Sequence, residues 1–468
     1  DPATAYVAAT RYKLDDFQPY LFKTHDYGQT WTRIVTGIDA HDFTRVIRED
    51  PVRQGLLYAG TETGMHVSFD DGEHWQSLQL NLPVVPIHDL VVKDTDLVVA
   101  THGRSFWILD DVTPLRQISD KVQSSPAHLF PPRPAIRFKS IGGFSQVPAS
   151  GLFYRKSGVA TIAARRRQKP NGETVDEFLN AGRNPPDGVI VTYYLKEQPE
   201  GEVKLSFLDA NEREIRSFSS EEKAEELSPA EISGTAKAKE LRIPKEAGTN
   251  RFVWDIRYPG PAKVDGFMGG DNVLVGPAVP PGTYQTRLTI GDQVYTESFE
   301  IQKDPRVSAT QADLEAQCAL LLRIRDRLTE THQSIKSIRD MRRQIEEWER
   351  RTQGQKEYER IAEAGKALKE KLSAIEEELI QVKAKVRQDT LNHPAKLNVK
   401  LAGLTGVVAS ADAAPTKQAY ELFEDLSTRI QVQLQRLQEL IDTDVKAFNT
   451  LIREAEMLAV TPSINHTH

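Results

Sequence analysis

A pattern of eight residues occurs twice in this chain and reads hydroxyl, any residue, Asp, any residue, Gly, any two residues, Trp. The first copy is Thr24–Trp31 and the second is Ser68–Trp75. Asp accepts hydrogen bonds from nearby backbone N–H groups, Gly takes the positive-φ position, and Trp supplies an apolar anchor at the start of the next strand. The octet therefore predicts a hairpin turn, with the structural residues Asp26, Gly28, Trp31, Asp70, Gly72 and Trp75.

The spacing of the two octets predicts a repeated sheet. Asp26 and Asp70 are 70 − 26 = 44 residues apart, and a four-stranded propeller blade needs roughly 40 to 45 residues. The strand-like runs Ala5–Thr10 and Leu57–Thr61 precede the octets at matching places. A third copy, Leu97–Asp111, keeps the alternating pattern but lacks the Gly and the final Trp. Residues 1–120 are therefore predicted to form three β-propeller blades.

These repeats resemble the Asp-box (BNR) propellers, which include sialidases, xyloglucanases and the sortilin ectodomain. The segments Asp42–Pro51, Tyr58–Trp75 and Ala100–Trp107 resemble most closely the closing blades of large bacterial sortilin-like proteins, often labelled glycosyl hydrolase. The later parts of the chain also resemble the C-terminal part of that group. The resemblance implies that residues 1–120 are the last three blades of the propeller, in an exported protein that is extracellular or periplasmic.

Three blades do not close a ring, because propellers typically carry 4 to 8 blades and an open array exposes strand edges. The chain also begins at Asp1 and Pro2, within a few residues of the first predicted strand. We therefore expect this chain to be the C-terminal part of a longer polypeptide, or a cleaved piece bound to its N-terminal propeller segment, which supplies the missing blades.

Residues 128–304 are predicted to form an immunoglobulin-like or fibronectin-like β-sandwich. Short alternating strands are separated by turn residues, and Gly291–Asp292 join the last two strands in a hairpin. Two inserts interrupt the pattern, a basic stretch from Arg165 to Gly182 and an acidic one from Glu221 to Glu231. We expect both to be solvated loops; the alternative is an electrostatic docking pair.

Residues 308–458 are predicted to form an antiparallel bundle of three long helices with coiled-coil character, and 459–468 a flexible tail. Apolar residues recur at three- and four-residue steps, with an N-cap in Ser308–Asp313 and reversals at Gly354 and in 392–414. Ala414 and Pro415 are the expected N-cap and N1 residues of the third helix. The apolar loop Leu401–Ala413 is expected to pack on the bundle or to form a contact patch. The bundle could also mediate homo-oligomer formation.

Composition excludes several classes of protein. The net charge of −7 gives no nucleic-acid signal, and no apolar run approaches the roughly 20 residues of a membrane-spanning helix. The single cysteine, Cys318, excludes an intrachain disulfide framework. Its helical spacing from Leu314 and Leu322 predicts a buried core thiol rather than a nucleophile.

The sequence contains none of the common motifs for nucleophilic, metal-dependent or phosphate-binding sites, and it predicts no metal site and no cofactor. Asp26, Asp70 and Asp71 are explained by the octet turns. Residues of the loops between blades are candidates for a binding surface, although a structural network is an equal alternative; they are His41, Asp42, Arg45, His88, Asp89, His102 and Arg104. For His466 and His468, in the tail, only adventitious metal contact is expected.

Two functions fit the sequence. In the first, the chain is part of a binding and assembly scaffold whose complete propeller recognises a polypeptide or a glycan. In the second, implied by the resemblance to sialidases and xyloglucanases, it belongs to a glycoside hydrolase whose catalytic carboxylates lie mostly on the missing N-terminal blades. The sequence has no sialidase-type arginine triad and no identifiable carboxylate pair, which favours binding.

Overall fold

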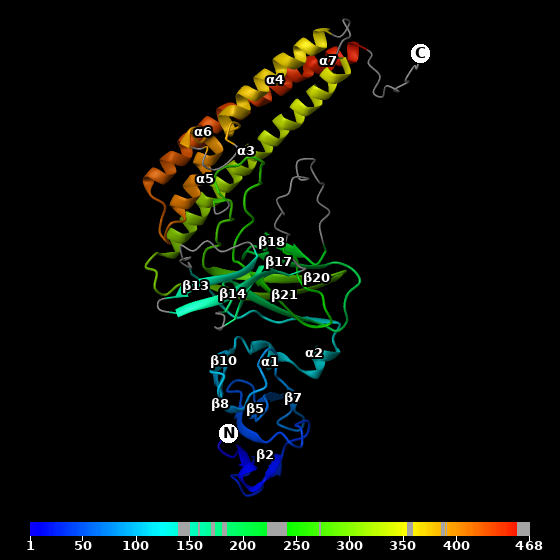
Figure 1. Cartoon of the computed structure of the whole chain (residues 1–468), viewed down its shortest axis with the longest axis vertical. Coiled ribbons are helices and arrows are strands. Elements are labelled where there is room, and N and C mark those ends of the chain that lie inside the picture. Colours follow the sequence, from blue (N-terminus) through cyan, green and yellow to red (C-terminus); the bar gives the residue numbers. More distant parts are fainter. Residues whose placement is uncertain are drawn as a thin grey trace, which may run out of the picture. The chain divides into compact units, whose positions relative to one another are not determined.

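The chain is multidomain, with β-sheets followed by a C-terminal helical region (Figure 1). The computed structural model describes residues 1–138, 150–157, 160–169, 174–179, 185–221, 241–270, 273–352, 359–384, 389 and 391–455. It has two compact units. The first comprises Asp1–Ala135, Gly142–Asp255 and Thr283–Glu300, and the second comprises Ile136–Ile141, Ile256–Gly282 and Ile301–His468.

Three small antiparallel sheets form the start of the first unit, each a meander in chain order. Sheet A contains β1 (Ala5–Arg11), β2 (Asp16–Thr24) and β3 (Thr32–Arg33). Sheet B contains β4 (Thr44–Glu49), β5 (Leu57–Thr61), β6 (Met65–Ser68) and β7 (Gln76–Ser77). Sheet C contains β8 (Ile87–Lys93), β9 (Asp96–Thr101) and β10 (Phe106–Leu109).

Sheet B packs on both of its neighbours because side chains alternate between the two faces of a strand. Leu57 and Ala59 of β5 belong to a hydrophobic cluster with Leu21 and Ile34 of the first repeat. Other side chains of sheet B belong to a second cluster that includes sheet C; they are Val46, Tyr58, Met65 and Val67, which pack with Leu90, Leu97 and Val99. The sheets therefore stack in chain order through apolar faces.

The short helices α1 (Thr113–Gln117) and α2 (Asp120–Ser124) and three further sheets follow in the chain. Their strand orders are β11-β16-β19, β12-β21-β20-β17-β18 and β13-β14-β15. Aromatic rings join the first two sheets, since Trp254 stacks on Phe207 at 4.3 Å. The strands are β11 (Ala127–Leu129), β12 (Ala135–Arg137), β13 (Gly151–Ser157), β14 (Ala160–Gln168), β15 (Thr174–Phe178), β16 (Val189–Leu195), β17 (Val203–Leu208), β18 (Glu214–Ser219), β19 (Gly248–Trp254), β20 (Gly282–Ile290) and β21 (Gln293–Lys303).

The expectation of a solvated basic loop from Arg165 is wrong. Arg165–Gln168 lie on β14, which pairs with β13 and β15. Arg166 forms a 2.6 Å ion pair with Asp176 on β15. Pairing with opposite charges on the neighbouring strand is what allows an arginine run to adopt a sheet conformation. The acidic insert lies outside the described residues, apart from Glu221.

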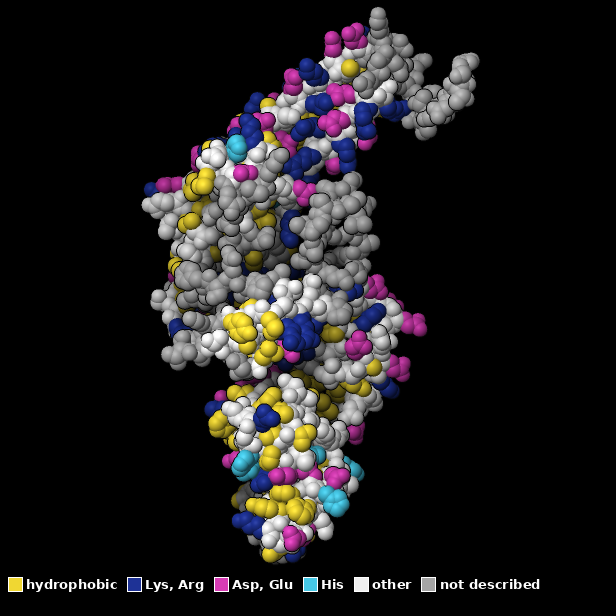
Figure 2. Space-filling model, in the orientation of Figure 1, with side chains coloured by type: hydrophobic (Ala, Val, Ile, Leu, Met, Phe, Trp, Pro, Cys, Tyr) yellow, Lys and Arg dark blue, Asp and Glu magenta, His cyan; other side chains and the backbone are white. Residues whose placement is uncertain are grey.

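The second unit is built around long helices: α3 (Gln311–Thr352), α4 (Glu359–Leu379), α5 (Leu397–Val408), α6 (Lys417–Leu440) and α7 (Lys446–Glu454). A π-helical turn, Ile441–Val445, joins α6 to α7. The helices share one hydrophobic core, to which the periodic apolar residues of the sequence contribute; examples are Ile324, Leu328, Ile335, Leu372, Ile375, Ile430 and Leu437. Charged side chains of both signs are mixed on the visible outer face (Figure 2).

Hydroxyl side chains set the starts of two helices. The Thr310 hydroxyl accepts a hydrogen bond from the Asp313 backbone N–H at 3.2 Å, and Asp313 accepts the Thr310 backbone N–H at 2.9 Å. This reciprocal pair is a capping box. The expected cap at Ala414 is wrong, because Thr416 caps α6 through the Ala419 N–H. Alanine has no side-chain acceptor for such a bond.

The expectation of a loop throughout residues 392–414 is also wrong, because α5 occupies its centre. Leu397, Leu401 and Leu404 lie in the core of the bundle. The segment reads as a loop in sequence because its glycines and small residues weaken the helical signal. Burial of its leucines compensates for this low propensity.

Substitution of Leu401 by Ala should reduce the free energy of unfolding of the helical unit by about 2–5 kcal/mol, because Leu401 is fully buried. Val407→Ala, in the same helix at a position 62% exposed, is the control and should change stability by less than about 0.5 kcal/mol. Urea denaturation followed by circular dichroism at 222 nm measures both. Equal effects of the two substitutions would contradict the buried placement of α5.

A buried polar contact fixes the segment before α3 to the bundle. His332 is fully buried, and its Nδ1 lies 2.5 Å from the Ala262 carbonyl oxygen. Its Nε2 lies 3.4 Å from the Asn398 amide nitrogen on α5. Burial lowers the pKa of His332 below its ordinary value, although the hydrogen bond to Ala262 opposes this effect. The neutral ring is therefore the stable form in the folded bundle.

Because the folded-state pKa of His332 is depressed, its contribution to stability should be complete above the ordinary imidazole pKa of 6.5 and should decrease as the pH falls below it. Thermal unfolding of the helical signal between about pH 8 and pH 5 measures this dependence. His332→Gln should be less stable at pH 8 but should show a flatter profile. A profile unchanged by the substitution would contradict this role.

Two further observations concern the helical region. Cys318 is a buried thiol, as predicted, and burial raises its pKa to about 11. A thiol with that pKa is mostly protonated at neutral pH and is a poor nucleophile.

Within the described residues, no helix combines the length and the apolar character needed to cross a membrane.

Candidate binding surface

The two octets form similar turns, between β2 and β3 and between β6 and β7. Asp26 accepts hydrogen bonds from the Thr30 backbone N–H at 2.8 Å and from the Thr24 hydroxyl at 2.8 Å. Asp70 accepts the corresponding bonds from His74 and Ser68. Gly28 and Gly72 have φ values of +81° and +86°. The octet side chains thus close the turn upon itself.

The octet aspartates are held in their ionised form. Hydrogen bonds from Thr30, and then from Thr24, lower the pKa of Asp26 to about 2. For Asp70, burial opposes ionisation, but bonds from His74 and Ser68 lower its pKa. A general acid needs a carboxyl group that is protonated near the working pH. These two carboxylates are therefore unsuited to that role.

Asp71, which follows the second octet aspartate, ties sheet B to sheet A. Its carboxylate accepts a hydrogen bond from the Tyr6 hydroxyl at 2.5 Å and contacts Lys23 at 2.8 Å and His25 Nε2 at 3.0 Å. Burial opposes ionisation of Asp71, but these partners lower its pKa. Burial, with Asp71 beside it, raises the pKa of Tyr6. This network of hydrogen bonds and ion pairs links sheet B to sheet A.

The two octet tryptophans differ in their surroundings. Trp75 is 4% exposed, belongs to the cluster between sheets A and B, and donates from Nε1 to the Ile34 carbonyl at 2.9 Å. Trp31 is 44% exposed, and its Nε1 donates to Gly28 within its own turn at 3.1 Å. Trp75 thus anchors sheet B to sheet A, whereas Trp31 contacts only its own turn through its N–H group.

The sequence-predicted binding residues lie elsewhere on the sheets, just before β4 or near its start, near the start of β8, and in the β9–β10 turn. Arg45 on β4 donates to Glu62 Oε2 at 2.7 and 2.5 Å. The Arg45 guanidinium also lies over the rings of Phe43 and Tyr12, which stack at 5.0 Å. The arginine is therefore fixed in position by an ion pair on one side and by aromatic rings on the other.

His88 and His102 approach each other in this region. His102 Nδ1 lies 3.1 Å from His88 Nε2, and the ring centroids are 4.6 Å apart. Burial, with Arg45 and His102 next in effect, lowers the pKa of His88, while Glu62 opposes the shift. The structure therefore brings Arg45, His88 and His102 into one electrostatic neighbourhood.

The other candidate residues have separate contacts. Asp42 is buried and accepts bonds from the Thr63 N–H and hydroxyl at 3.1 and 2.7 Å. Asp89 forms an exposed ion pair with Arg48 at 2.8 Å. His41 and Arg104 are exposed, and the backbone N–H of Arg104 donates to the Thr101 hydroxyl. Asp42 is thus a loop-forming residue, and Asp89 joins β8 to β4.

Sequence reasoning missed three residues of this surface, Glu62, Tyr12 and Phe43. Glu62 was detectable, because it follows Thr61 at the end of β5 as His102 follows Thr101 at the end of β9. Aligning the two repeats at these threonines places both side chains in equivalent turns. Tyr12 lies in the short 3-10 helix Tyr12–Leu14, an insertion without an equivalent in the other repeats, so no repeat signal identifies it.

Asp110, just after β10, has a different environment from the octet aspartates. Burial raises its pKa, and the neighbouring Asp96 adds to the shift. Asp96 is itself engaged, because it pairs with Arg133 at 3.0 Å and accepts the Asp111 backbone N–H. Asp96 and Asp110 therefore form a like-charge pair that is partly neutralised by Arg133.

Within the described residues, one group could offer ligands to a metal ion. Asp70, Glu73 and His74 each place a ligand atom within 4.8 Å of the others, and all three are exposed. His74 Nδ1 is already 2.8 Å from Asp70 Oδ2. Nothing else at this turn indicates a bound ion.

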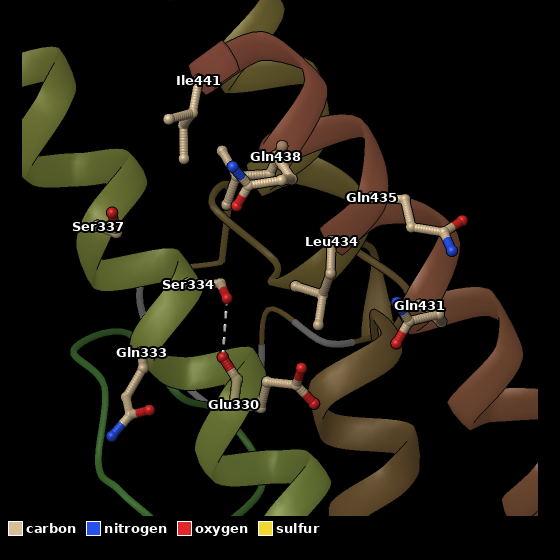
Figure 3. A pocket seen from close by; sticks show the side chains of 10 residues that line it. Glu330, Gln333, Ser334, Ser337, Gln431, Leu434, Gln435, Gln438 and Ile441 are labelled. Atoms are coloured by element: carbon tan, nitrogen blue, oxygen red, sulfur yellow. Dashed lines mark hydrogen bonds between the residues drawn. The ribbon is translucent and has the colours of Figure 1, made fainter.

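The helical unit has a groove of about 520 Å³ between α3 and α6 (Figure 3). Amide and hydroxyl side chains dominate its walls, and Leu434, Leu437 and Ile441 add apolar surface. The single carboxylate, Glu330, pairs with Arg327 at 2.7 Å. Because its one carboxylate is already paired, the residues that line the groove offer no free pair of acid and base groups.

Comparisons with known proteins give little further information. No protein-family model matches the chain, and no curated protein matches it. The chain is weakly similar in structure to the crystal structure of an ancestral GH74 enzyme, with 11% identity and a TM-score of 0.19. The likeness covers 47% of this chain and 37% of that one, so the chain spans little more than a third of its length. A TM-score of this size carries no argument.

Substitution of Trp75 by Ala should destabilise sheets A and B by about 3–5 kcal/mol, because the ring is buried between them. Trp31→Ala is the matched control and should cost less than about 1 kcal/mol, because its ring is partly exposed. Amide hydrogen exchange of β5 measures the first effect and that of β2 the second. A large loss of protection for Trp31→Ala would contradict the difference in anchoring.

Proposed function

We propose that this chain is the C-terminal part of an exported, sortilin-like Asp-box propeller protein that binds a polypeptide or a glycan and acts as an assembly scaffold. The three stacked meander sheets and the two closed octet turns support the assignment of residues 1–120 to propeller blades. The aromatic contact between Trp254 and Phe207 supports an immunoglobulin-like sandwich in residues 128–304, a type of module that commonly spaces neighbouring domains.

The observation that carries the proposal is the grouping of Arg45, His88 and His102, with the Arg45 guanidinium over the rings of Tyr12 and Phe43. The two imidazoles can form hydrogen bonds with a ligand, whereas Phe43 is buried and the Arg45 guanidinium is already bonded to Glu62. Both histidines are exposed to solvent. This combination is suited to recognition of polar groups on a chain-like ligand.

The carboxylates in the same region favour binding over hydrolysis. Glu62 is paired with Arg45, Asp89 with Arg48, and Asp42 with Thr63. Glycoside hydrolysis requires one carboxyl group as acid and another as base or nucleophile, both facing the scissile bond. Each of these three side chains instead has a structural partner.

The double substitution His88→Ala and His102→Ala should weaken ligand binding by about tenfold, equivalent to about 1.4 kcal/mol, without unfolding sheet C. The probes are arrays of xyloglucan oligosaccharides, sialylated oligosaccharides and extended peptides, applied to the full chain. His393→Ala, at a position in the helical unit, is the control. Unchanged binding by the double variant, or no binding of any probe by the unmodified chain, would contradict the proposal.

The same oligosaccharides test the alternative. Release of reducing sugar by the full chain, and its loss on substitution of Asp110 by Asn, would identify a hydrolase instead of a binding scaffold. Mass spectrometry of the oligosaccharides after incubation detects either outcome.

A further inference from the structure

The outward face of sheet A is equivalent to faces that are buried in sheets B and C. Strand pairing establishes the equivalence, because Val7 pairs with Phe22 in sheet A as Ala59 pairs with His66 in sheet B. The octets give the same alignment, since Phe22 and His66 each lie two residues before the first octet residue. Val7 and Ala59 therefore occupy the same position in their repeats.

The chain contains two successive interfaces of one kind. Leu57 and Ala59 of sheet B are fully buried in the cluster shared with sheet A. At the equivalent places in sheet C, Leu97 and Val99 are buried in the cluster shared with sheet B. Each sheet thus receives the preceding sheet on the same face.

In sheet A this face is open. Val7 is 42% exposed and Trp31 is 44% exposed, whereas their equivalents Ala59 and Trp75 are buried. Tyr27, at the octet position of Asp71, is 74% exposed, whereas Asp71 bonds to three residues of sheet A. Among the described strands, β1 pairs only with β2, but β5 pairs with both β4 and β6. In the part of the chain that the structure describes, sheet A therefore has no strand equivalent to β4 beside β1, and no sheet covers its outward face.

We infer that Val7, Phe22 and Trp31, with the free edge of β1, form a docking site for one more antiparallel sheet of the same octet-bearing type. This inference rests on the propeller assignment in the proposed function and specifies the partner: a β-sheet repeat that packs on sheet A as sheet A packs on sheet B. The exposed apolar residues of sheet A determine what kind of surface this partner sheet must have. Its contact face must be apolar, and it needs no acceptor for the Trp31 indole N–H, which already donates to the Gly28 carbonyl.

The proposed contact on sheet A differs from the contact between sheets A and B in its polar residues. Asp71 links sheets B and A through Lys23 and His25, but the first octet offers the uncharged phenol of Tyr27. A covering sheet that fits sheet A therefore needs no basic side chains opposite this octet position. An apolar surface with a single hydrogen-bond acceptor would match Tyr27.

The chain's own second repeat provides the probe. Residues 34–94 contain β4–β7, the octet turn and β8. In the chain β8 pairs with β9, so the added copy of β8 would pair with β1, the equivalent strand of sheet A. Fusing a second copy of residues 34–94 ahead of Asp1 keeps the full chain intact. The added copy would present Leu78 and Leu82, which occupy the repeat positions of Ile34 and Ile38, to the open face.

Cysteine labelling measures docking directly, because the native Cys318 is buried. Val7→Cys should react quickly with a maleimide in the unmodified chain and at least about tenfold more slowly in the extended chain, because a covered side chain reacts only through local opening. Ala59→Cys, at the equivalent covered position, is the control and should be protected in both. Leu78→Asp with Leu82→Asp in the added copy should restore fast labelling of Val7→Cys.

Unchanged labelling of Val7→Cys in the extended chain would overturn the inference. Protection that persists in the Leu78→Asp and Leu82→Asp extension would also overturn it, because the apolar face would then not mediate docking. These outcomes are independent of ligand binding. If the extended chain protects position 7 but the variant without His88 and His102 still binds ligand normally, the docking site stands. The proposed binding surface is then wrong.

Discussion

The burial of Trp75 between sheets A and B is the contact on which the β-rich start of this chain depends. The indole supplies a large apolar surface, and its N–H is satisfied by the Ile34 carbonyl. A small sheet needs an apolar face packed against another element to be stable. Stacking lets sheet B bury apolar side chains on both of its faces, in one cluster with sheet A and in another with sheet C.

Asp71 adds direction to this stacking. Its bonds to Tyr6, Lys23 and His25 reach only one neighbour, so sheet B has distinct sides toward sheets A and C. The octet therefore closes a turn through Asp70 and also points its tryptophan and the following aspartate toward the preceding sheet. At the start of β8 and in the β9–β10 turn, by contrast, the imidazoles of His88 and His102 are exposed, and Arg45 on β4 is paired with Glu62.

Apolar periodicity predicted the helical region well where it was strong and failed where it was interrupted. The regular leucines and isoleucines of α3 and α6 lie in the core as expected. The glycines of residues 401–408 concealed α5, because the helix there depends on burial rather than on propensity. Arg165–Gln168 were mistaken for a loop for a related reason, since their opposite charges on β15 lie some ten residues away in sequence.

The sequence by itself determined the repeat, the turn chemistry of the octets and the change from strands to helices, because these depend on residues close together in the chain. It also placed Arg45, His88 and His102 in loops beside the predicted strands, as candidates for a binding surface. Only the tertiary structure decided that Glu62, Tyr12 and Phe43 join them and that Asp42 and Asp89 have structural partners. It also distinguished the two octet tryptophans. Their sequences are alike, but burial depends on whether another sheet lies against them.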